Sequence, residues 1–166
     1  FRELLVRWMQ WGVFCPIFRL HGDRVPYKGP DEEFRKGIKQ FGSGADNEIW
    51  CFGEDNYPIL AECIRQRERL RPYVRELMKE AHEKGTPVIR PLFYEFPDDA
   101  EAWKVETVHL FGPDVLVAPV LEEGARKREV YLPKGARWTD AATGQVYDGG
   151  QSITVDAPIE RMPIFL

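Results

Sequence analysis

The hydrophobic pattern of this chain changes near residue 86, and that change limits the folds open to it. Upstream, apolar residues recur at helical spacing from Phe1 to Trp11 and again from Leu60 to Ala81. Downstream, short runs rich in β-branched and aromatic residues alternate with turn signals. A chain of 166 residues has room for one medium domain or for parts of two. We therefore predict two parts, residues 1–86 with helices and residues 87–166 made of strands.

In the first part, the run Ile17-Phe18-Arg19-Leu20-His21 has the length of a buried strand. Residues 22–56 read as a long loop that contains six glycines. The second helical pattern contains Pro72, which removes a backbone donor, so we expect a kink or break near Arg71. Gly85 supplies the expected end of that helix.

The second part is predicted to be an antiparallel sandwich or barrel, because many short strands follow one another between turns. A helix is expected at the start of residues 98–111. The expected strands lie in residues 87–96, 114–120, 129–132, 136–140, 145–147, 152–156 and 159–166.

Composition excludes several classes of partner. The net charge of -4 gives no basic stripe for nucleic acid. No segment approaches the roughly 18 apolar residues that a membrane span needs. The three cysteines, Cys15, Cys51 and Cys63, fit neither a zinc site nor a redox motif, and we interpret them as reduced thiols of a cytoplasmic protein. The chain opens on Phe1, inside a helical pattern, so we expect further protein upstream.

Three collinear segments then resemble glycoside hydrolase family 31. They are VRWMQWGVFCPIFRLHG (6–22), GTPVIRPLFYEFPDD (85–99) and FGPDVLVAPVLEEGARKREVYLPKGARW (111–138), and the tail GGQSITVDAPIERMPIFL also fits. The resemblance implies α/β plus β architecture: a (β/α)8 TIM barrel followed by β-sandwich domains. On that template, residues 1–86 resemble the last part of the barrel, with strand eight near 16–20. Residues 87–166 resemble the proximal C-terminal β-sandwich.

The resemblance also implies a sugar contact. The histidine of the FRLHG segment, His21, resembles a family residue that binds hydroxyls of the sugar before the scissile bond. A neutral imidazole offers one donor and one acceptor, which suits a hydroxyl. Arg19 is a second candidate for substrate binding, the alternative being a brace between loops. Trp50 is a third, the alternative being simple packing.

The family's two catalytic aspartates belong to earlier barrel strands, so no catalytic residue is assigned in this chain. Asp23, Asp46, Glu48, Glu54 and Asp55 match no family motif and are interpreted as solvated loop acids. No metal and no cofactor is implied. The resemblance implies that the parent enzyme hydrolyses terminal α-glycosidic bonds of oligosaccharides or glycosides with retention, as an α-glucosidase first and an α-xylosidase next.

The chain alone is predicted to be inactive, because it lacks both carboxylates. The alternative function is a non-catalytic structural or carbohydrate-binding module, or a degenerate relative that kept the fold without the chemistry. Exposed, coplanar aromatic residues on one sandwich face would distinguish a carbohydrate-binding module. We expect a structural role for the sandwich, with Trp103 and Trp138 in its core. The oligomeric state cannot be predicted from these residues.

Overall fold

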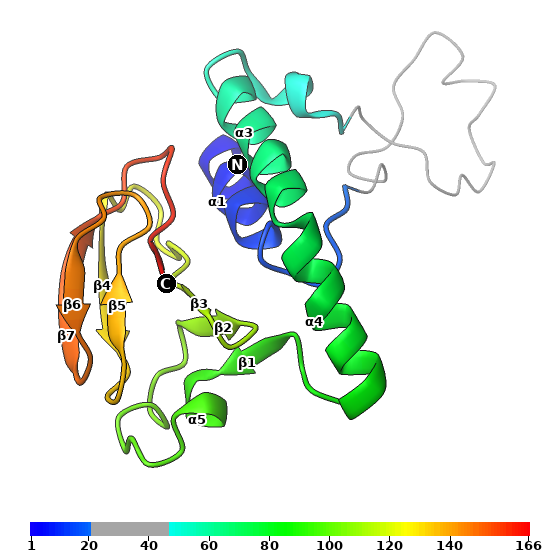
Figure 1. Ribbon diagram of the computed structural model, residues 1–166. Coiled ribbons are helices and arrows are strands. Elements are labelled where there is room, and N and C mark those ends of the chain that lie inside the picture. The colour runs from blue at the N-terminus through cyan, green and yellow to red at the C-terminus, as the bar shows by residue number, and fades with distance from the viewer. Residues whose placement is uncertain (21–46) are drawn as a thin grey trace, which may run out of the picture.

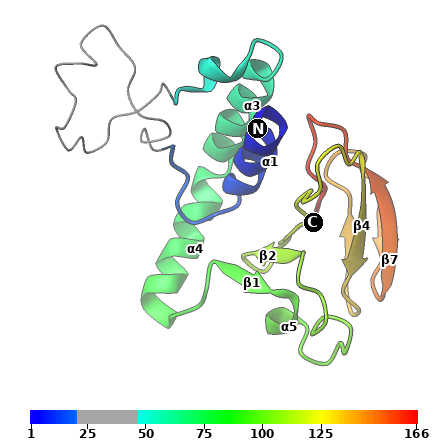
Figure 2. The ribbon, with the colours of Figure 1, turned by 180° about the vertical axis from the view of Figure 1, so that it is seen from behind.

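The computed structural model describes residues 1–20 and 47–166. Helices gather on one side, two-stranded sheets stand on the other, and a small sheet lies between them (Figure 1). The view from behind shows the same three layers (Figure 2). None of the helices in residues 1–20 and 47–166 combines the length and the apolar content that crossing a bilayer requires.

The helical layer follows the predicted periodicity. Its elements are α1 (Arg2–Gly12), the 3-10 helix η1 (Ile49–Phe52), α3 (Tyr57–Arg69) and α4 (Arg71–Lys84). The predicted break is confirmed, since Leu70 ends α3 and begins α4, with Pro72 in the first turn of α4. Gly85 ends α4 at φ 71°, the left-handed conformation that glycine adopts without strain.

The second half is made of short antiparallel strands, as predicted. A four-stranded sheet has the order β1-β2-β3-β8, and β4 pairs with β7 and β5 with β6. The elements are β1 (Ile89–Pro91), α5 (Leu92–Glu95), β2 (His109–Phe111), β3 (Val115–Val117), β4 (Lys127–Leu132), β5 (Arg137–Thr139), β6 (Val146–Asp148), β7 (Gln151–Asp156) and β8 (Ile164–Phe165).

Two local predictions in this half are wrong. The expected helix at the start of 98–111 is a series of tight turns, in which the Ala102 N–H donates to the Asp99 carbonyl at 3.0 Å. Asp99 organises these turns, because its carboxylate accepts from the Tyr131 hydroxyl and the Lys134 N–H. Trp138 is buried in the core as expected, but Trp103 is 58% exposed and stacks on Phe93.

The buried strand predicted for 17–21 is also wrong in its described part. Residues 17–20 have no regular structure, and Ile17 is 79% exposed. A strand exists only through backbone pairing with a neighbour. Within residues 1–20 and 47–166 all strands begin at Ile89 or later and pair among themselves, so nothing there pairs with residues 17–20. His21 and most of the expected loop 22–56 lie outside the described residues.

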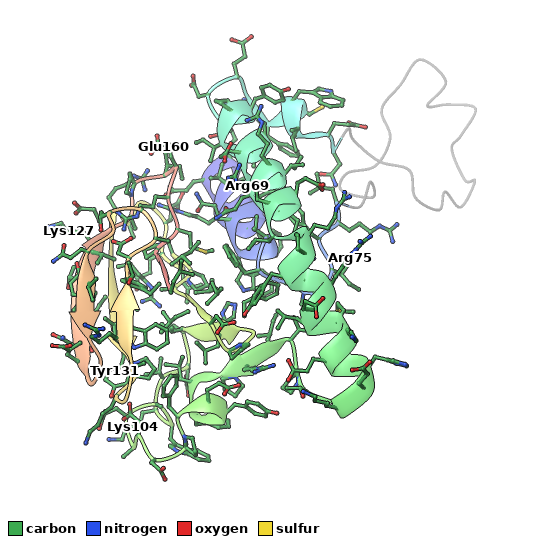
Figure 3. All side chains as sticks on the ribbon, in the orientation of Figure 1. Arg69, Arg75, Lys104, Lys127, Tyr131 and Glu160 are labelled. Atoms are coloured by element: carbon green, nitrogen blue, oxygen red, sulfur yellow. The ribbon has the colours of Figure 1, made fainter. Side chains whose placement is uncertain are left out.

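The four-stranded sheet is buried on both faces. Along β3, Val115 and Val117 face the helices and pack with residues of α1, α3 and α4. Leu116 and Ala118 face the other way and pack against β4 and β7. Figure 3 shows side chains filling both spaces. This explains why residues 115–120 are apolar without a break, since successive strand residues point to opposite faces and both faces are covered.

A polar stripe on α1 ties the helices to the sandwich. Glu3, Arg7 and Gln10 follow one another at helical spacing and all contact sandwich loops. Arg7 is 7% exposed and donates to the carbonyls of 125, 157, 158 and 161 at 2.8–3.2 Å. Gln10 donates to the Ile159 carbonyl at 2.7 Å, so α1 holds the chain that leads into β8.

Gly112 provides a stability test. Its φ of +65° and an added Cβ only 2.2 Å from the Tyr73 oxygen both oppose a side chain, whereas Gly144 has φ +73° and open space around it. We expect Gly144→Ala to cost about 1–2 kcal/mol from the left-handed backbone alone. Gly112→Ala should cost about 1–3 kcal/mol more, from the added clash. Urea unfolding of both variants measures the difference, and equal losses would contradict the packing described here.

Candidate functional site

The two described site candidates, Arg19 and Trp50, do not both line the hollow beside α1. Arg19 is exposed and lines a hollow of about 380 Å³ beside α1. Trp50 is 67% exposed on η1 and does not line this hollow. His21, the third candidate, lies outside the described residues.

The hollow is mainly apolar. It lies between α1 and the segment 15–20, and among the described residues that line it Arg19 alone has a charged side chain. One face of α1 carries exposed apolar side chains here. The exposed apolar residues of α1 and of the segment that follows it are Phe1, Leu4, Trp8, Trp11, Ile17 and Leu20.

Arg67 on α3 fixes the chain that leads into this hollow. Its guanidinium donates to the carbonyls of Val13 and Cys15 at 2.7 and 2.6 Å, and to that of Pro16 at 2.9 Å. Burial lowers the pKa of the Arg67 guanidinium from its ordinary value, which is high enough to keep arginine charged. Arg67 therefore places a cation at the end of α1, where the helix dipole favours positive charge.

The thiols of Cys15 and Cys63 lie in the same region and are poor nucleophiles. Burial raises the pKa of Cys15, and it raises that of Cys63 to about 11. A thiol whose pKa is raised carries little thiolate near neutral pH, and the thiolate is the nucleophilic form. Cys15 donates instead to the Trp11 carbonyl at 3.6 Å. We assign neither residue a catalytic role.

The described acids of the 47–56 segment form no paired-carboxylate centre. Glu48, Glu54 and Asp55 are exposed, and Glu48 accepts hydrogen bonds from its neighbours Asn47 and Cys51. Within the described ranges no group of three acidic, histidine or cysteine side chains could hold a metal ion. Asp23 and Asp46 lie outside those ranges.

Family models account for nearly the whole chain. The model of the glycosyl hydrolases family 31 TIM-barrel domain matches residues 1–77, and that of the family 31 C-terminal domain matches residues 85–166. The chain belongs to glycoside hydrolase family 31. The predicted fold class, the end of a (β/α)8 barrel followed by an antiparallel sandwich, is confirmed. A division at residue 86 itself stays a prediction.

Known relatives are α-glycosidases. "Alpha-glucosidase 2" of Bacillus thermoamyloliquefaciens is 39% identical over 99% of this chain and 18% of its own length. The crystal structure of a family 31 α-xylosidase from a soil metagenome, complexed with xylose, is 58% identical with a TM-score of 0.90, over 99% of this chain and 24% of that one. A Flavobacterium johnsoniae family 31 dextranase, as a D412A mutant with isomaltotriose, is 37% identical with a TM-score of 0.81, over 99% and 18%. The chain thus spans about a fifth of the proteins it matches.

Sequence reasoning did not identify Arg67 as a structural anchor. The signal was present, because Arg67 occupies the apolar stripe of its helix while neighbouring charges lie off it. Arg65, Arg69 and Arg71 have side chains that are 60–64% exposed and pair with glutamates. An arginine within an apolar stripe indicates either a side chain that binds buried carbonyls or one that binds a ligand.

The open face of α1 should drive association of the recombinant 166-residue chain. Trp8 is 59% exposed in a contiguous apolar surface, whereas Trp103 is 58% exposed on the sandwich. We expect Trp8→Lys to reduce self-association, measured by sedimentation velocity, because it places a charge in that surface. Trp103→Lys adds the same charge elsewhere and should not. Equal effects of the two substitutions would show that the α1 face is not the associating surface.

Proposed function

We propose that the protein containing this chain hydrolyses terminal α-glycosidic bonds with retention of configuration. The observation that carries the proposal is the match to the family's barrel and C-terminal domains over one continuous chain. In a retaining glycosidase one carboxylate attacks the anomeric carbon, while another protonates the leaving oxygen and then activates water. Both carboxylates are assigned to barrel strands outside residues 1–166, and the chain alone is proposed to be inactive.

Within that reaction, we propose that this chain contributes to substrate binding. His21 and Arg19 are proposed to bind hydroxyls of the sugar in the subsite before the scissile bond, since Arg19 lies near the end of the segment that resembles barrel strand eight and His21 directly follows it. Active sites of such barrels lie at the C-terminal ends of the strands. Trp50 is the weaker candidate, because it is not among the residues that line the hollow beside Arg19.

We propose xylose ahead of glucose as the terminal sugar. The family 31 α-xylosidase is 58% identical to this chain, against 39% for the Bacillus α-glucosidase. This ranking reverses the one drawn from the sequence, which put α-glucosidase first and α-xylosidase next. The two sugars differ at C5, where glucose carries a hydroxymethyl group and xylose only hydrogen.

For the sandwich, the contacts favour a buttress over a carbohydrate-binding module. Trp138 is buried, and the inner strand faces are used to cover the four-stranded sheet. Trp103 is 58% exposed and stacks on the half-buried Phe93, with ring centroids 4.4 Å apart and planes at 10°. Only the outer indole face is left for a sugar, and a single ring is a poor platform.

The proposal is tested on the full-length enzyme with aryl α-xylosides and aryl α-glucosides. We expect the α-xyloside to give the larger kcat/KM, and His21→Ala to lower it by roughly 10- to 100-fold through loss of substrate orientation. The 166-residue chain should show no hydrolysis above its own His21→Ala variant. A full-length enzyme inactive on both substrates would sink the proposal, and a larger kcat/KM for the α-glucoside would restore the original ranking.

A further inference from the structure

Arg67 differs from the other arginines of its helix region. Arg65, Arg69 and Arg71 are exposed and pair with Glu62 or Glu68 across the surface. Arg67 is half-buried and, among the residues that the structure describes, forms no ion pair. The three hydrogen bonds that its guanidinium donates in the described chain all go to backbone carbonyls.

Those carbonyls belong to the stretch where the chain leaves α1. Val13 is the C-cap of the helix, and Cys15 and Pro16 follow at once. Carbonyls beyond a helix end have no helical partner and must be satisfied otherwise. A planar guanidinium that donates to three of them fixes both the position and the direction of the backbone, which a lysine ammonium on a flexible stem cannot do as rigidly.

Phe18 is a second residue that holds the segment after α1. Phe18 packs against the core shared by the helices and the sheet. It lies so close to Gly12 that an added Cβ there would be 3.1 Å from the Phe18 ring. Arg19 comes next and lines the open hollow. Residues 17–20 have no sheet pairing in the described chain, where Arg67 holds the residues just before them and Phe18 packs against the core.

We propose that Arg67 is a positioning residue of the glycosidase reaction. It sets the path of the segment 13–20, so that the side chain of Arg19 meets the sugar in the orientation the reaction needs. The inference rests on the proposed function and adds to it a residue that touches no substrate. A displacement of about 1 Å in such a segment can cost a hundredfold in rate.

The test compares Arg67→Lys with Arg65→Lys in the full-length enzyme. Both substitutions keep the charge and are on α3, but Arg65 contacts only exposed Glu62. We measure kcat, KM and thermal unfolding, with the folded fraction determined by circular dichroism at the assay temperature. Arg67→Lys should lower kcat/KM on an aryl α-xyloside by roughly 10- to 100-fold per folded molecule, mainly through kcat. Arg65→Lys should leave kcat and KM unchanged.

Wild-type kinetic constants in folded Arg67→Lys would overturn the inference, since the residue would then serve stability alone. Failure to recover folded Arg67→Lys would also overturn it, because the role would be folding. These results differ from failure of the proposed function, in which the wild-type enzyme itself is inactive on α-xylosides and α-glucosides.

Discussion

The fold depends on burial of both faces of the sheet β1-β2-β3-β8. Helices cover one face and the β4–β7 sheet covers the other, so each layer needs the middle one. Apolar burial contributes about 25 cal/mol per Å² and is the main favourable term in folding. A sandwich cut away at residue 86 would leave Phe111, Val115 and Val117 facing water. The barrel end and the sandwich therefore form one structural unit, although two family models describe them.

Hydrogen bonds from two arginines fix the alignment of elements that apolar burial brings together. Arg7 joins α1 to the loops before β8, and Arg67 joins α3 to the chain after α1, and both use carbonyls as acceptors. Hydrogen bonds to charged groups contribute about 1.5–3 kcal/mol each, and losing one side of a buried set leaves the other unsatisfied. Apolar contacts tolerate sliding, whereas these bonds specify a register. The hydrogen bonds of Arg7 and Arg67 thus fix how the layers align, and those of Arg67 fix the backbone that leads to Arg19.

Local signals predicted much of this from sequence. Pro72 and Gly85 marked helix ends through backbone chemistry, and most β runs of the second half contain a strand. Prediction was wrong where the outcome depended on distant partners. Residues 17–20 were read as a strand from their apolar content, but pairing is decided by neighbours. The helical spacing from Phe1 to Trp11 identified α1, but it did not show that Leu5, Val6 and Met9 face the core while Trp8 is exposed. His21 could be proposed only through family resemblance, because nothing in its spacing identifies a sugar contact.

The proposed function fits this arrangement, because a buttressed barrel end can hold the side chains proposed to bind sugar in a fixed place. Its central claim is that helices and sandwich share one cooperative core. Native-state hydrogen exchange of the 166-residue chain at low denaturant, followed peptide by peptide, tests that claim most directly. The account predicts that peptides from α3 and from β4 and β7 exchange through openings of equal free energy. Protection that persists in β4 and β7 after α3 has lost its own would contradict it, because the sandwich would then be stable without the helices.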